Sequence, residues 1–499
     1  MSGALIGLDI GTSSIKAAAF DEHGNQLTGA SAPVSVISPH AGWAEQQPED
    51  WWQGTCSVLR QISERIDPRT IIAIGLSGQC PGHVLIDRHH QAIGRAIIWR
   101  DQRAAQEATW LKQHISPEQA RAWTGSAPAS DATSPPARLL WISKHRAADL
   151  EQSVAVLQPK DFIACKLTGN IITDRHSAYS LYDPLQNRYH PEYFDALAFP
   201  IEKMPAVRSP VETAGELSPS ASSQTGLPQG TRLVVGTIDA YCDNLAGGIT
   251  SPGRAVDVAG TSESVSLSVE HSVDAPGIYP ACLEDGGCFL CGPTQSGGDT
   301  LRWLAKCFYP EFAGGVDFQT MEQEAGAVSA GCNGLTFLPY LAGERAPIWD
   351  SAARGSFIGL TFDHTRPYFT RAVYESIGFA IRHILALAEN AAGYRAEHLV
   401  VCGGGSRSQF WNQIKADILQ RPVMPTAITE TGCLGAAMLA SVGAGIHPDL
   451  YTASDQMIIF RDRVDPDIHH KDAYDQAYQA YRQYYPALKP IWSSSGTKE

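Results

Sequence analysis

Residues 5–27 read LIGLDIGTSSIKAAAFDEHGNQL. Two apolar runs of strand character flank the polar turn at residues 11–14, and a second turn follows at residues 23–25. Short apolar runs separated by Gly, Asn and Ser are typical of antiparallel strands that are joined by tight turns. The segment therefore predicts a meander of antiparallel strands whose first tip is polar.

The same pattern returns about half a chain later. Residues 8–13 read LDIGTS and residues 256–262 read VDVAGTS, and a strand-like run follows each. Gly and Ser are common in turns, so two unrelated turns are the alternative interpretation. The apolar-Asp-apolar strand before both turns instead favours a duplicated hairpin that holds phosphates from two halves facing each other across a cleft. We call residues 11–13 the first turn and residues 260–262 the second turn.

Strand and helix patterns alternate through the first half of the chain. Residues 71–76 and 83–87 have strand character, while residues 48–66 and 103–114 have helical periodicity. Alternation of this kind predicts an α/β architecture. A chain of 499 residues is long enough for two large domains. Glycine and proline cluster at residues 246–252, so we place the boundary there, with domains at 1–246 and 247–499.

Composition narrows the class of function. The formal net charge is −14, which argues against a nucleic acid or an anionic membrane as partner, because both require a basic surface. Residues 1–11 have the character of a strand and not of a signal peptide. The 11 cysteines are scattered, which predicts reduced thiols in the cytoplasm. Cys288 and Cys291 have CxxC spacing, but a strand with buried thiols is the favoured interpretation over a metal or redox role.

Two segments are rich in Ser, Pro, Thr, Ala or Gly. They are residues 126–137 and residues 209–230. Both are predicted to be long loops of the kind that often serve as lids or surface excursions.

Phosphoryl transfer requires a holder for the phosphates, a divalent cation and an acceptor for the proton of the attacking hydroxyl. The backbone N–H groups of a glycine turn converge on anions, so the first and second turns are candidate phosphate holders. Asp9 precedes the first turn and could either organise Mg²⁺ or simply cap the turn. The run CGGGS at residues 402–406, the glycine loop, joins a predicted strand to a predicted helix at 409–419 and is a third candidate.

The candidate base is Asp239. It follows a predicted strand at residues 232–235 and Gly236, so its carboxylate should lie at the edge of a sheet, where open α/β proteins bind ligands. Asp239 could alternatively cap the following helix. Asp243 lies four residues further on, and spacing alone does not choose between the two carboxylates.

Taken together, the motifs resemble the FGGY carbohydrate kinase family, and within it the xylulokinases. They occur in the order of the family and cover nearly the whole chain. The matching stretches are GLDIGTSSIKAAAFD (7–21), GLSGQCPGHVLID (75–87), IIWRDQRA (97–104), GTIDAYCDNLAGG (236–248), VAGTSESV (258–265), LPYLAGERAPIWDSAARGSFIGL (338–360), RAVYESIGFAIRHI (371–384) and CGGGSRSQFWNQIKADILQRPV (402–423).

The resemblance implies an α/β fold with two actin-like (ribonuclease H-like) ATPase domains that flank an interdomain cleft. It assigns the acceptor sugar, the first phosphate motif and the catalytic aspartate to domain 1–246. The second phosphate motif and adenosine binding fall to domain 247–499. It implies Asp239 as the catalytic base in preference to Asp243, and Asp9 near Mg²⁺.

The resemblance also assigns the remaining site residues. The residues implied near ATP are Thr12, Ser13, Lys16, Gly260, Thr261, Ser262, Gly298, Gly403, Gly404, Ser406 and Asn412. The residues implied near the acceptor sugar are Gln79, Cys80, Trp99, Asp101 and Arg103, together with Asp239. Arg345 could meet a phosphate or form an ion pair with Glu344 or another neighbouring acid.

Two departures from the xylulokinase pattern lie on the sugar side. Residues 78–82 read GQCPG where xylulokinases typically read GQMHG, and Ala240 stands where they typically have Asn. A site that pairs a particular hydroxyl discriminates strongly, so these losses affect which acceptor is tolerated. The expected activity is ATP-dependent phosphorylation of a small sugar or polyol. A ketopentose such as xylulose is the first candidate for this acceptor. Ribulose, erythritol, glycerol and gluconate are the alternatives.

More remote alternatives are an actin- or chaperone-like ATPase and a non-catalytic sugar sensor. The implied cofactors are ATP and Mg²⁺, and the implied partners are the small-molecule acceptor and ATP, with no nucleic acid and no membrane. The resemblance alone raises a homodimer as a further expectation.

Overall fold

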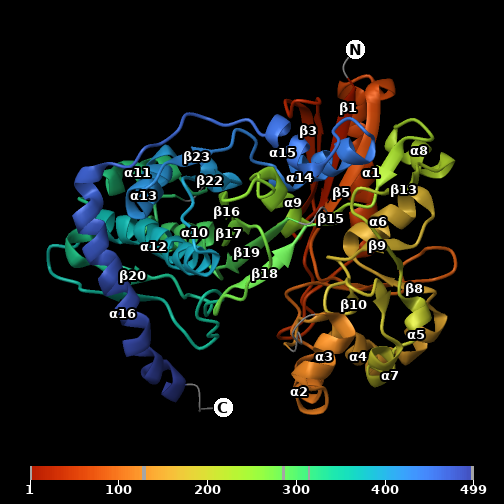
Figure 1. Ribbon diagram of the computed structural model, residues 1–499, viewed down its shortest axis with the longest axis horizontal. Helices are drawn as coiled ribbons and strands as arrows, with labels where there is room; N and C mark the ends of the chain where they lie inside the picture. The colour runs from red at the N-terminus through yellow and green to blue at the C-terminus, as the bar shows by residue number, and fades with distance from the viewer. Residues whose placement is uncertain (1–2, 126–130, 284–286, 313–314, 496–499) are drawn as a thin grey trace. The chain divides into compact units, whose positions relative to one another are not determined.

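The computed structural model describes residues 3–125, 131–283, 287–312 and 315–495 (Figure 1). The chain divides into two compact units. The first consists of Met1–Asp243 together with Gly432–Met457, and the second consists of Asn244–Thr431 together with Ile458–Glu499. The division lies between Asp243 and Asn244, three residues before the expected boundary, and a late segment of the chain belongs to the first unit.

A mixed sheet forms the centre of the first unit. Its strand order is β13-β14-β5-β1-β2-β3, and β15 also pairs with β5. β1 is antiparallel to β2 and parallel to β5. The strands are β1 (Ala4–Ile10), β2 (Ser14–Phe20), β3 (Gln26–Pro33), β5 (Ile71–Gly78), β13 (Thr213–Glu216), β14 (Arg232–Val234) and β15 (Thr237–Ile238). The meander predicted at residues 5–27 is therefore confirmed as β1, β2 and the start of β3.

Helices cover both faces of this sheet. α1 (Pro48–Arg65) packs against β2 and β3, and its Trp51 shares a buried cluster with Ile6 and Leu8. Side chains alternate between the faces of a strand, so Gly7 points the other way. There α14 (Thr431–Gly443) comes so close that a Cβ on Gly7 would lie 1.7 Å from the carbonyl oxygen of Cys433. Glycine is required at this close approach.

The rest of the first unit consists of shorter elements. Its helices are α2 (Ala105–His114), α3 (Pro117–Thr124), α4 (Pro135–His145), α5 (Ala147–Gln152), α6 (Pro159–Thr168), α7 (Pro191–Ala196), α8 (Pro219–Thr225), α9 (Asp239–Ala246, which runs into the second unit) and α15 (Leu450–Met457). Its strand pairs are β4 (Glu45–Gln46) with β7 (Ala96–Ile97), β6 (Val84–Ile86) with β8 (Ala155–Leu157), β9 (Ile172–Asp174) with β12 (Ala206–Arg208), and β10 (Tyr182–Asp183) with β11 (Arg188–Tyr189).

The second unit repeats the strand arrangement of the first. Its sheet has the order β18-β19-β17-β16-β22-β23, in which β16 is antiparallel to β17 and parallel to β22. The strands are β16 (Ala255–Ala259), β17 (Glu263–Val269), β18 (Tyr279–Cys282), β19 (Cys288–Pro293), β22 (Leu399–Cys402) and β23 (Val423–Pro425). In both sheets the first strand of the hairpin is parallel to a later strand on its other side, but β17 pairs with β19 and β19 with β18, so the second sheet has four antiparallel strands where the first has a three-stranded meander. The strands expected on either side of the second turn are thus present.

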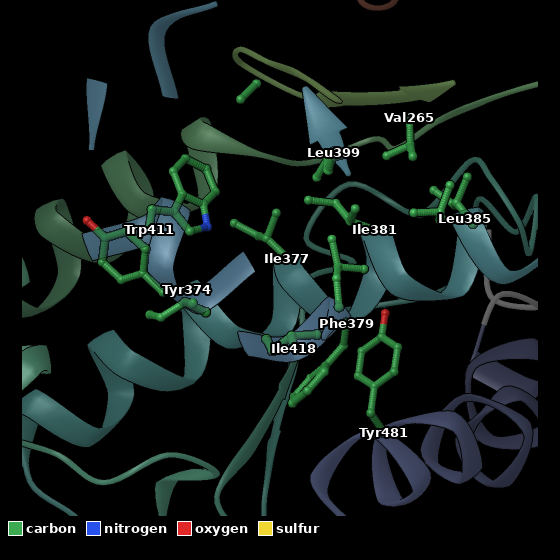
Figure 2. Packing of buried hydrophobic residues seen from close by; sticks show 14 of the residues in the cluster. Val265, Tyr374, Ile377, Phe379, Ile381, Leu385, Leu399, Trp411, Ile418 and Tyr481 are labelled. Carbon is green, nitrogen blue, oxygen red and sulfur yellow. The ribbon is translucent and has the colours of Figure 1, made fainter. Parts of the chain in front are cut away.

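One long helix organises the core of this unit. α12 (Arg366–Ala392) buries a continuous face against the sheet and its neighbouring helices, and Figure 2 shows Ile377, Ile381 and Leu385 directed toward Val265 and Leu399 of the sheet. Trp411 of α13 and Tyr481 of α16 complete the cluster. The other elements are α10 (Gly298–Phe308), α11 (Phe318–Gly326), α13 (Gln409–Leu419), α16 (Lys471–Ser495), β20 (Thr336–Leu338) and β21 (Ser356–Ile358).

Two expectations about loops were partly wrong. Residues 209–230 contain β13 and α8. Ser218 caps α8 through a hydrogen bond from the backbone N–H of Ala221, and Gly226 ends it in the left-handed region with φ of 76°, so serines and a glycine here mark helix ends. In the segment 126–137, residues 135–137 begin α4, and residues 126–130 lie outside the described residues.

The expectation that all cysteines are reduced was wrong for one pair. Cys282 and Cys288 face each other in the register of β18 and β19 and form a disulfide, with their Cα atoms 4.0 Å apart. Direct cross-strand neighbours come close enough for such a bond, whereas spacing along the sequence does not reveal the pairing. Cys291, the other member of the CxxC pattern, is a buried free thiol on β19.

Candidate active site

Asp9 lies one residue before the end of β1, at the edge of the first sheet. It accepts a hydrogen bond from the Ser77 hydroxyl at 2.7 Å (Oδ1), and Lys16 lies directly opposite it on β2. The side chain of Asp9 is only partly buried. Gly432 at the start of α14 comes close to its carboxylate, because a Cβ there would lie 3.1 Å from Cγ of Asp9. Asp9 is therefore fixed by its neighbours and still accessible.

Thr12 joins the first turn to residues expected near the acceptor. Its hydroxyl accepts a hydrogen bond from Nε1 of Trp99 at 2.8 Å and donates one to Oε1 of Gln79 at 3.2 Å. Gln79 in turn donates to Oε1 of Gln46 at 2.7 Å, and Gln46 donates to the carbonyl oxygen of Thr12 at 2.7 Å. Three side chains from separate segments, those of Gln46, Gln79 and Trp99, thus hold the first turn in place.

Asp101 and Arg103 form an ion pair with each other. Arg103 donates to both carboxylate oxygens of Asp101, at 2.8 Å and 2.7 Å, and also pairs with Glu45 at 2.8 Å. Its guanidinium lies 3.6 Å from the centroid of the Trp43 ring. Asp101 is fully buried and also accepts from the backbone N–H of Ala44 at 2.6 Å. Each charged group already has several internal partners, an arrangement that supports the loops around Trp99.

Arg138 connects two of the expected acceptor segments. It is fully buried and donates to the carbonyl oxygens of Pro81 at 2.9 Å and Trp99 at 3.0 Å. The neighbouring Cys80 precedes Pro81 through a cis peptide bond. Burial, and then the negative charge of Asp239, raise the pKa of the Cys80 thiol well above its usual value. Cys80 therefore remains a neutral thiol close to the candidate base.

Asp239 is the first residue of α9 and follows β15 directly. β15 is parallel to β5, with Ile238 opposite Gly78, and Ile10 of β1 also lies opposite Gly78. Asp239 is thus at the same sheet edge as the first turn. Burial, and then the negative charges of Asp9 and Asp243, raise the pKa of Asp239 well above its usual value. A carboxylate of raised basicity is suited to accept a proton near neutral pH.

The second turn is held against the start of α10. The backbone N–H of Gly298 donates to the carbonyl oxygen of Gly260 at 3.0 Å, and the N–H of Asp299 donates to that of Thr261 at 3.2 Å. A Cβ on Gly298 would lie 2.6 Å from the oxygen of Gly260. Gly298 therefore permits the helix to approach the turn. Thr261 itself is exposed at the tip.

The glycine loop lies beside the second turn. Cys402 is opposite Val258 in the parallel pair of β22 and β16, so both loops leave the same sheet edge. Gly403 has φ of 78°, and a Cβ on it would lie 2.8 Å from the carbonyl oxygen of Ala259. Ser406 is buried and donates to Gly403 at 2.8 Å, and Asn412 donates to the carbonyl oxygen of Ser406 at 2.9 Å. Nothing lies within 4 Å of a Cβ on Gly404, so this part of the loop is open.

Comparison with known families agrees with this arrangement. Residues 4–246 match the N-terminal domain of the FGGY family of carbohydrate kinases, and residues 255–444 match its C-terminal domain. The chain belongs to the FGGY family of carbohydrate kinases. The two matches cover most of the chain and follow each other in the order of its two sheets.

Individual relatives extend over nearly the full length of this kinase. A xylulose kinase of Bacillus subtilis is 28% identical over 98% of this chain and 97% of its own. The crystal structure of xylulose kinase from Rhodospirillum rubrum has a TM-score of 0.87 at 29% identity, covering 98% of this chain and 100% of the other. A gluconate kinase structure from Lactobacillus acidophilus has a TM-score of 0.87 at 25% identity, covering 99% and 100%. The kinase is therefore xylulokinase-like, with two domains of the actin-like ATPase type.

Arg345 of the kinase lies next to the second turn. It donates to the carbonyl oxygen of Thr294 at 3.1 Å and lies 3.5 Å from the Ser262 hydroxyl. Glu344 accepts a hydrogen bond from the backbone N–H of Arg345 at 2.8 Å, and its burial raises its pKa to about 7. The guanidinium thus supports the strand end and the turn.

Three side chains form a buried ion-pair cluster beneath the second turn. Lys415 of α13 lies 2.6 Å from Asp257 and 3.5 Å from Glu263, and all three are fully buried. Asp257 lies two residues before the last residue of β16, whereas Asp9 lies one residue before the last residue of β1, so the two aspartates are offset by one position in their hairpins. This cluster was not expected from the sequence.

The structure gathers the expected residues in two groups. Asp9, the first turn, Gln79, Cys80, Trp99 and Asp239 surround one edge of the first sheet, and the second turn, Gly298, Gly403, Ser406 and Asn412 surround one edge of the second. Sequence reasoning missed Gln46, Arg138 and Lys415. A single charge within the apolar stretch 135–142 was a signal for Arg138, because a lone buried arginine usually has fixed partners.

Across the described parts of the chain, no group of three or more His, Cys, Asp or Glu side chains is arranged to hold an ion. Mg²⁺ in phosphoryl-transfer enzymes commonly takes one or two carboxylates and completes its shell with water and phosphate oxygens. The accessible, hard oxygen donor of Asp9 fits that mode of binding. None of the described helices is long and apolar enough to cross a membrane.

Proposed function

We propose that this kinase phosphorylates a neutral ketose, with a ketopentose such as xylulose as the first candidate, and that Asp239 is the general base. In this proposal Asp239 accepts the proton of the acceptor hydroxyl while the hydroxyl oxygen attacks the γ-phosphorus of ATP in line with the leaving ADP. The observation that carries the proposal is the place of Asp239 at the sheet edge that also holds the first turn, Gln79 and Cys80.

The electrostatics of this edge support the choice of base. The charges of Asp9 and Asp243 contribute to the raised pKa of Asp239. The efficiency of a general base is greatest when its pKa approaches the working pH. Asp243 remains the local alternative, because it belongs to the same helix and contributes to the same field.

The same charges favour a neutral acceptor over a sugar acid. Three carboxylates, those of Asp9, Asp239 and Asp243, interact at this edge, and an anionic acceptor such as gluconate would meet their repulsion. The structural likeness to a gluconate kinase keeps gluconate as the second candidate. Pro81 and Ala240 stand where xylulokinases typically present His and Asn, so the acceptor contacts differ from theirs.

We assign the nucleotide to the two turns and the glycine loop. The first turn with Ser13 and Lys16, and the second turn, would hold the phosphates of ATP through backbone N–H and hydroxyl groups. The glycine loop with Asn412 would hold adenosine. Asp9 would hold Mg²⁺, which supplies charge neutralisation of the phosphates when it is bound. The acceptor and the base thus belong to the first unit, and adenosine to the second.

A coupled assay of ADP release tests the acceptor. We expect turnover with a ketopentose, and lower kcat/KM with hexuloses, glycerol, erythritol and gluconate. Turnover with gluconate alone would replace the ketose by the second candidate. Nucleotide hydrolysis that no acceptor accelerates would favour the more remote ATPase alternative.

The variant Asp239→Asn tests the base. We expect its kcat to fall by about 10³-fold or more, because the general base is lost while the shape of the side chain is kept, and ATP binding measured by calorimetry should stay within about threefold. Asp455→Asn, an exposed aspartate of α15 in the same unit, is the matched control. An Asp239→Asn enzyme with near wild-type turnover would defeat the assignment.

A further inference from the structure

Asp239 is preceded by a very short strand. β15 has two residues, Thr237 and Ile238, and among the described strands it pairs with the end of β5 alone. Gly236 before it has φ of 71°, and a Cβ there would lie 2.0 Å from the carbonyl oxygen of Leu76. The chain therefore turns sharply into this strand, and two backbone pairs alone offer little to fix the direction of the next side chain.

A buried carboxylate holds the residue two positions before Asp239. The Thr237 hydroxyl donates to Oδ2 of Asp174 at 2.8 Å. Thr237 is 2% exposed and Asp174 is fully buried, so solvent does not compete for this bond. Hydrogen bonds to a charged acceptor are about twice as strong as neutral ones. Asp174 ends β9, an element that is separate from the sheet of β15.

The turn after Asp174 also contacts the residue two positions after Asp239. The ring of His176 stacks on the ring of Tyr241, with centroids 4.0 Å apart and planes inclined by 26°. The backbone N–H of His176 donates to Oδ2 of Asp174 at 3.0 Å, so the turn is itself anchored on the carboxylate. One short segment, residues 174–176, thus contacts the chain on both sides of Asp239.

Asp174 is fixed by an internal ion pair. Lys160 of α6 lies 2.9 Å from its Oδ1 and 2.6 Å from Oδ1 of Asp161, and it lies 3.4 Å from the carbonyl oxygen of Val235, just before Gly236. Burial opposes the charge on Asp174, but Lys160, His176 and the hydrogen bond from Ser177 together keep the pKa of Asp174 below its usual value. The Ser177 hydroxyl also donates to Oδ1. The carboxylate therefore remains charged and has several donors that hold its orientation.

We propose that Asp174, held by Lys160, is a positioning residue that sets the orientation of Asp239 through Thr237 and through the stack of His176 on Tyr241. The proposal rests on the proposed role of Asp239 as base. Neither Asp174 nor Thr237 reaches the reacting atoms in it. Their effect is to keep the carboxylate of Asp239 within the narrow range of positions in which a proton can be accepted.

The variant Thr237→Val removes the hydroxyl and keeps the shape of the side chain. We expect kcat to fall by about 10- to 100-fold, because a displacement of the order of 1 Å has that effect on a reacting geometry. The KM for ATP should stay within about twofold, since the change leaves nucleotide binding alone. Thr237→Ser keeps the donor and should restore kcat to within about threefold of wild type.

Thr225→Val is the matched control. Thr225 is a fully buried threonine of α8 in the same unit, and its hydroxyl donates to the carbonyl oxygen of Ala221 at 2.8 Å. Both variants lose one buried hydroxyl, so we expect both to lower Tm, Thr237→Val by more because its partner is a charged carboxylate. Only Thr237→Val should lower kcat. Equal kcat values for the two variants would overturn the proposal.

Hydrogen exchange provides a readout that requires no substrate. We expect the backbone amides of residues 238–241 to exchange faster in Thr237→Val than in the wild type or in Thr225→Val, because this segment loses its anchor on Asp174. Unchanged exchange in this segment would overturn the proposal independently of any activity.

The outcomes separate this proposal from the assignment of the base. If Asp239→Asn is inactive and Thr237→Val behaves like Thr225→Val, the base stands and the positioning role is wrong. If Asp239→Asn is active, the base assignment is wrong, and faster exchange in Thr237→Val would then show a structural contact without a catalytic purpose, which also removes the positioning role.

Discussion

The first and second turns lie on equivalent hairpins, yet the aspartate before each has a different environment. Asp9 is partly accessible, accepts a hydrogen bond from Ser77, and contributes its negative charge to the raised pKa of Asp239. Asp257 is fully buried and paired with Lys415. The two hairpins share the strand order of their sheets, but one carboxylate can act on a ligand and the other serves the interior.

This difference shows that two similar hairpins can place their aspartates in different roles. In the first unit the charges of Asp9, Asp239 and Asp243 interact at the sheet edge, where we propose that a cation binds and a base acts. In the second unit Asp257 lies one position further from its turn and is neutralised inside by Lys415, so the edge carries the backbone of the second turn and the glycine loop. Phosphates are anions and would be repelled by an acid at that edge.

Among the variants that compare the two hairpins, Asp9→Asn should have the largest effect on turnover. We expect kcat to fall by about 10²- to 10³-fold, because the proposed ligand of Mg²⁺ is lost. Tm should stay the same or rise, since one of the like charges near Asp239 is removed. Kinetics with thermal melting check both. Asp257→Asn, its counterpart, should lose stability and keep turnover per folded molecule. A loss of stability in Asp9→Asn together with a loss of turnover in Asp257→Asn would contradict the comparison.

The variant Lys415→Met tests the interior acid directly. It leaves Asp257 and Glu263 buried without their cation, so we expect a loss of about 3–5 kcal/mol in the free energy of unfolding. Lys306→Met, an exposed lysine of α10, is the control. Burial already raises the pKa of Glu263.

The effect of Lys415→Met should depend on pH. A carboxyl whose pKa is raised in the folded state contributes to stability below its unfolded pKa and loses that contribution as pH rises through the folded pKa. The deficit of Lys415→Met should therefore shrink as pH falls. Denaturant titrations at several pH values measure this, and a deficit that is constant with pH would contradict the buried pair of acids.

The variant Asp243→Asn tests how the negative charges at the edge of the first sheet affect Asp239. Activity should fall as pH decreases through the raised pKa of Asp239, because the base must be ionised. Removal of the charge of Asp243 lowers that pKa, so the acidic limb of the kcat profile should move to lower pH by on the order of one unit. Asp455→Asn should leave the limb in place. Complete inactivity of Asp243→Asn would instead identify Asp243 as the base.

The two threonines at the turn tips should show the smallest effects. The Thr12 hydroxyl contacts Gln79 and Trp99, whereas Thr261 is exposed at the tip of the second turn. We expect Thr12→Val to raise the KM for the acceptor about five- to tenfold, the equivalent of one lost hydrogen bond. Thr261→Val should raise the KM for ATP instead. Steady-state kinetics with each substrate varied separates the two, and a common effect on both KM values would remove the distinction.

The strands and the helix around the two turns and the glycine loop could be predicted from sequence, because their signals are local. The apolar-Asp-apolar runs before both turns, the strand before the glycine loop and the helix at residues 409–419 all appear in the structure. Strand alternation and glycine turns are encoded within about ten residues. Motif order then identified the family over nearly the whole chain.

Long-range pairing could not be predicted in the same way. Lys415 meets Asp257 across 158 residues and Gln46 meets Gln79 across 33, and no periodicity marks such partners. Residues 209–230 were misjudged because serine and glycine are typical both of loops and of helix ends, and α8 is only seven residues long. The pairing of Cys282 with Cys288 depends on the register of two strands, which is also absent from the local pattern.

The late segment of the first unit has a consequence for biosynthesis. Every strand of the first sheet is present once residue 243 has been made, but α14, which covers the face of Gly7 and Gly75, begins at residue 431. At about 5–20 residues per second, translation of residues 244–431 takes on the order of 10–40 seconds. During that interval a nascent first unit carries an uncovered apolar face, so its folding is completed only after most of the second unit has left the ribosome.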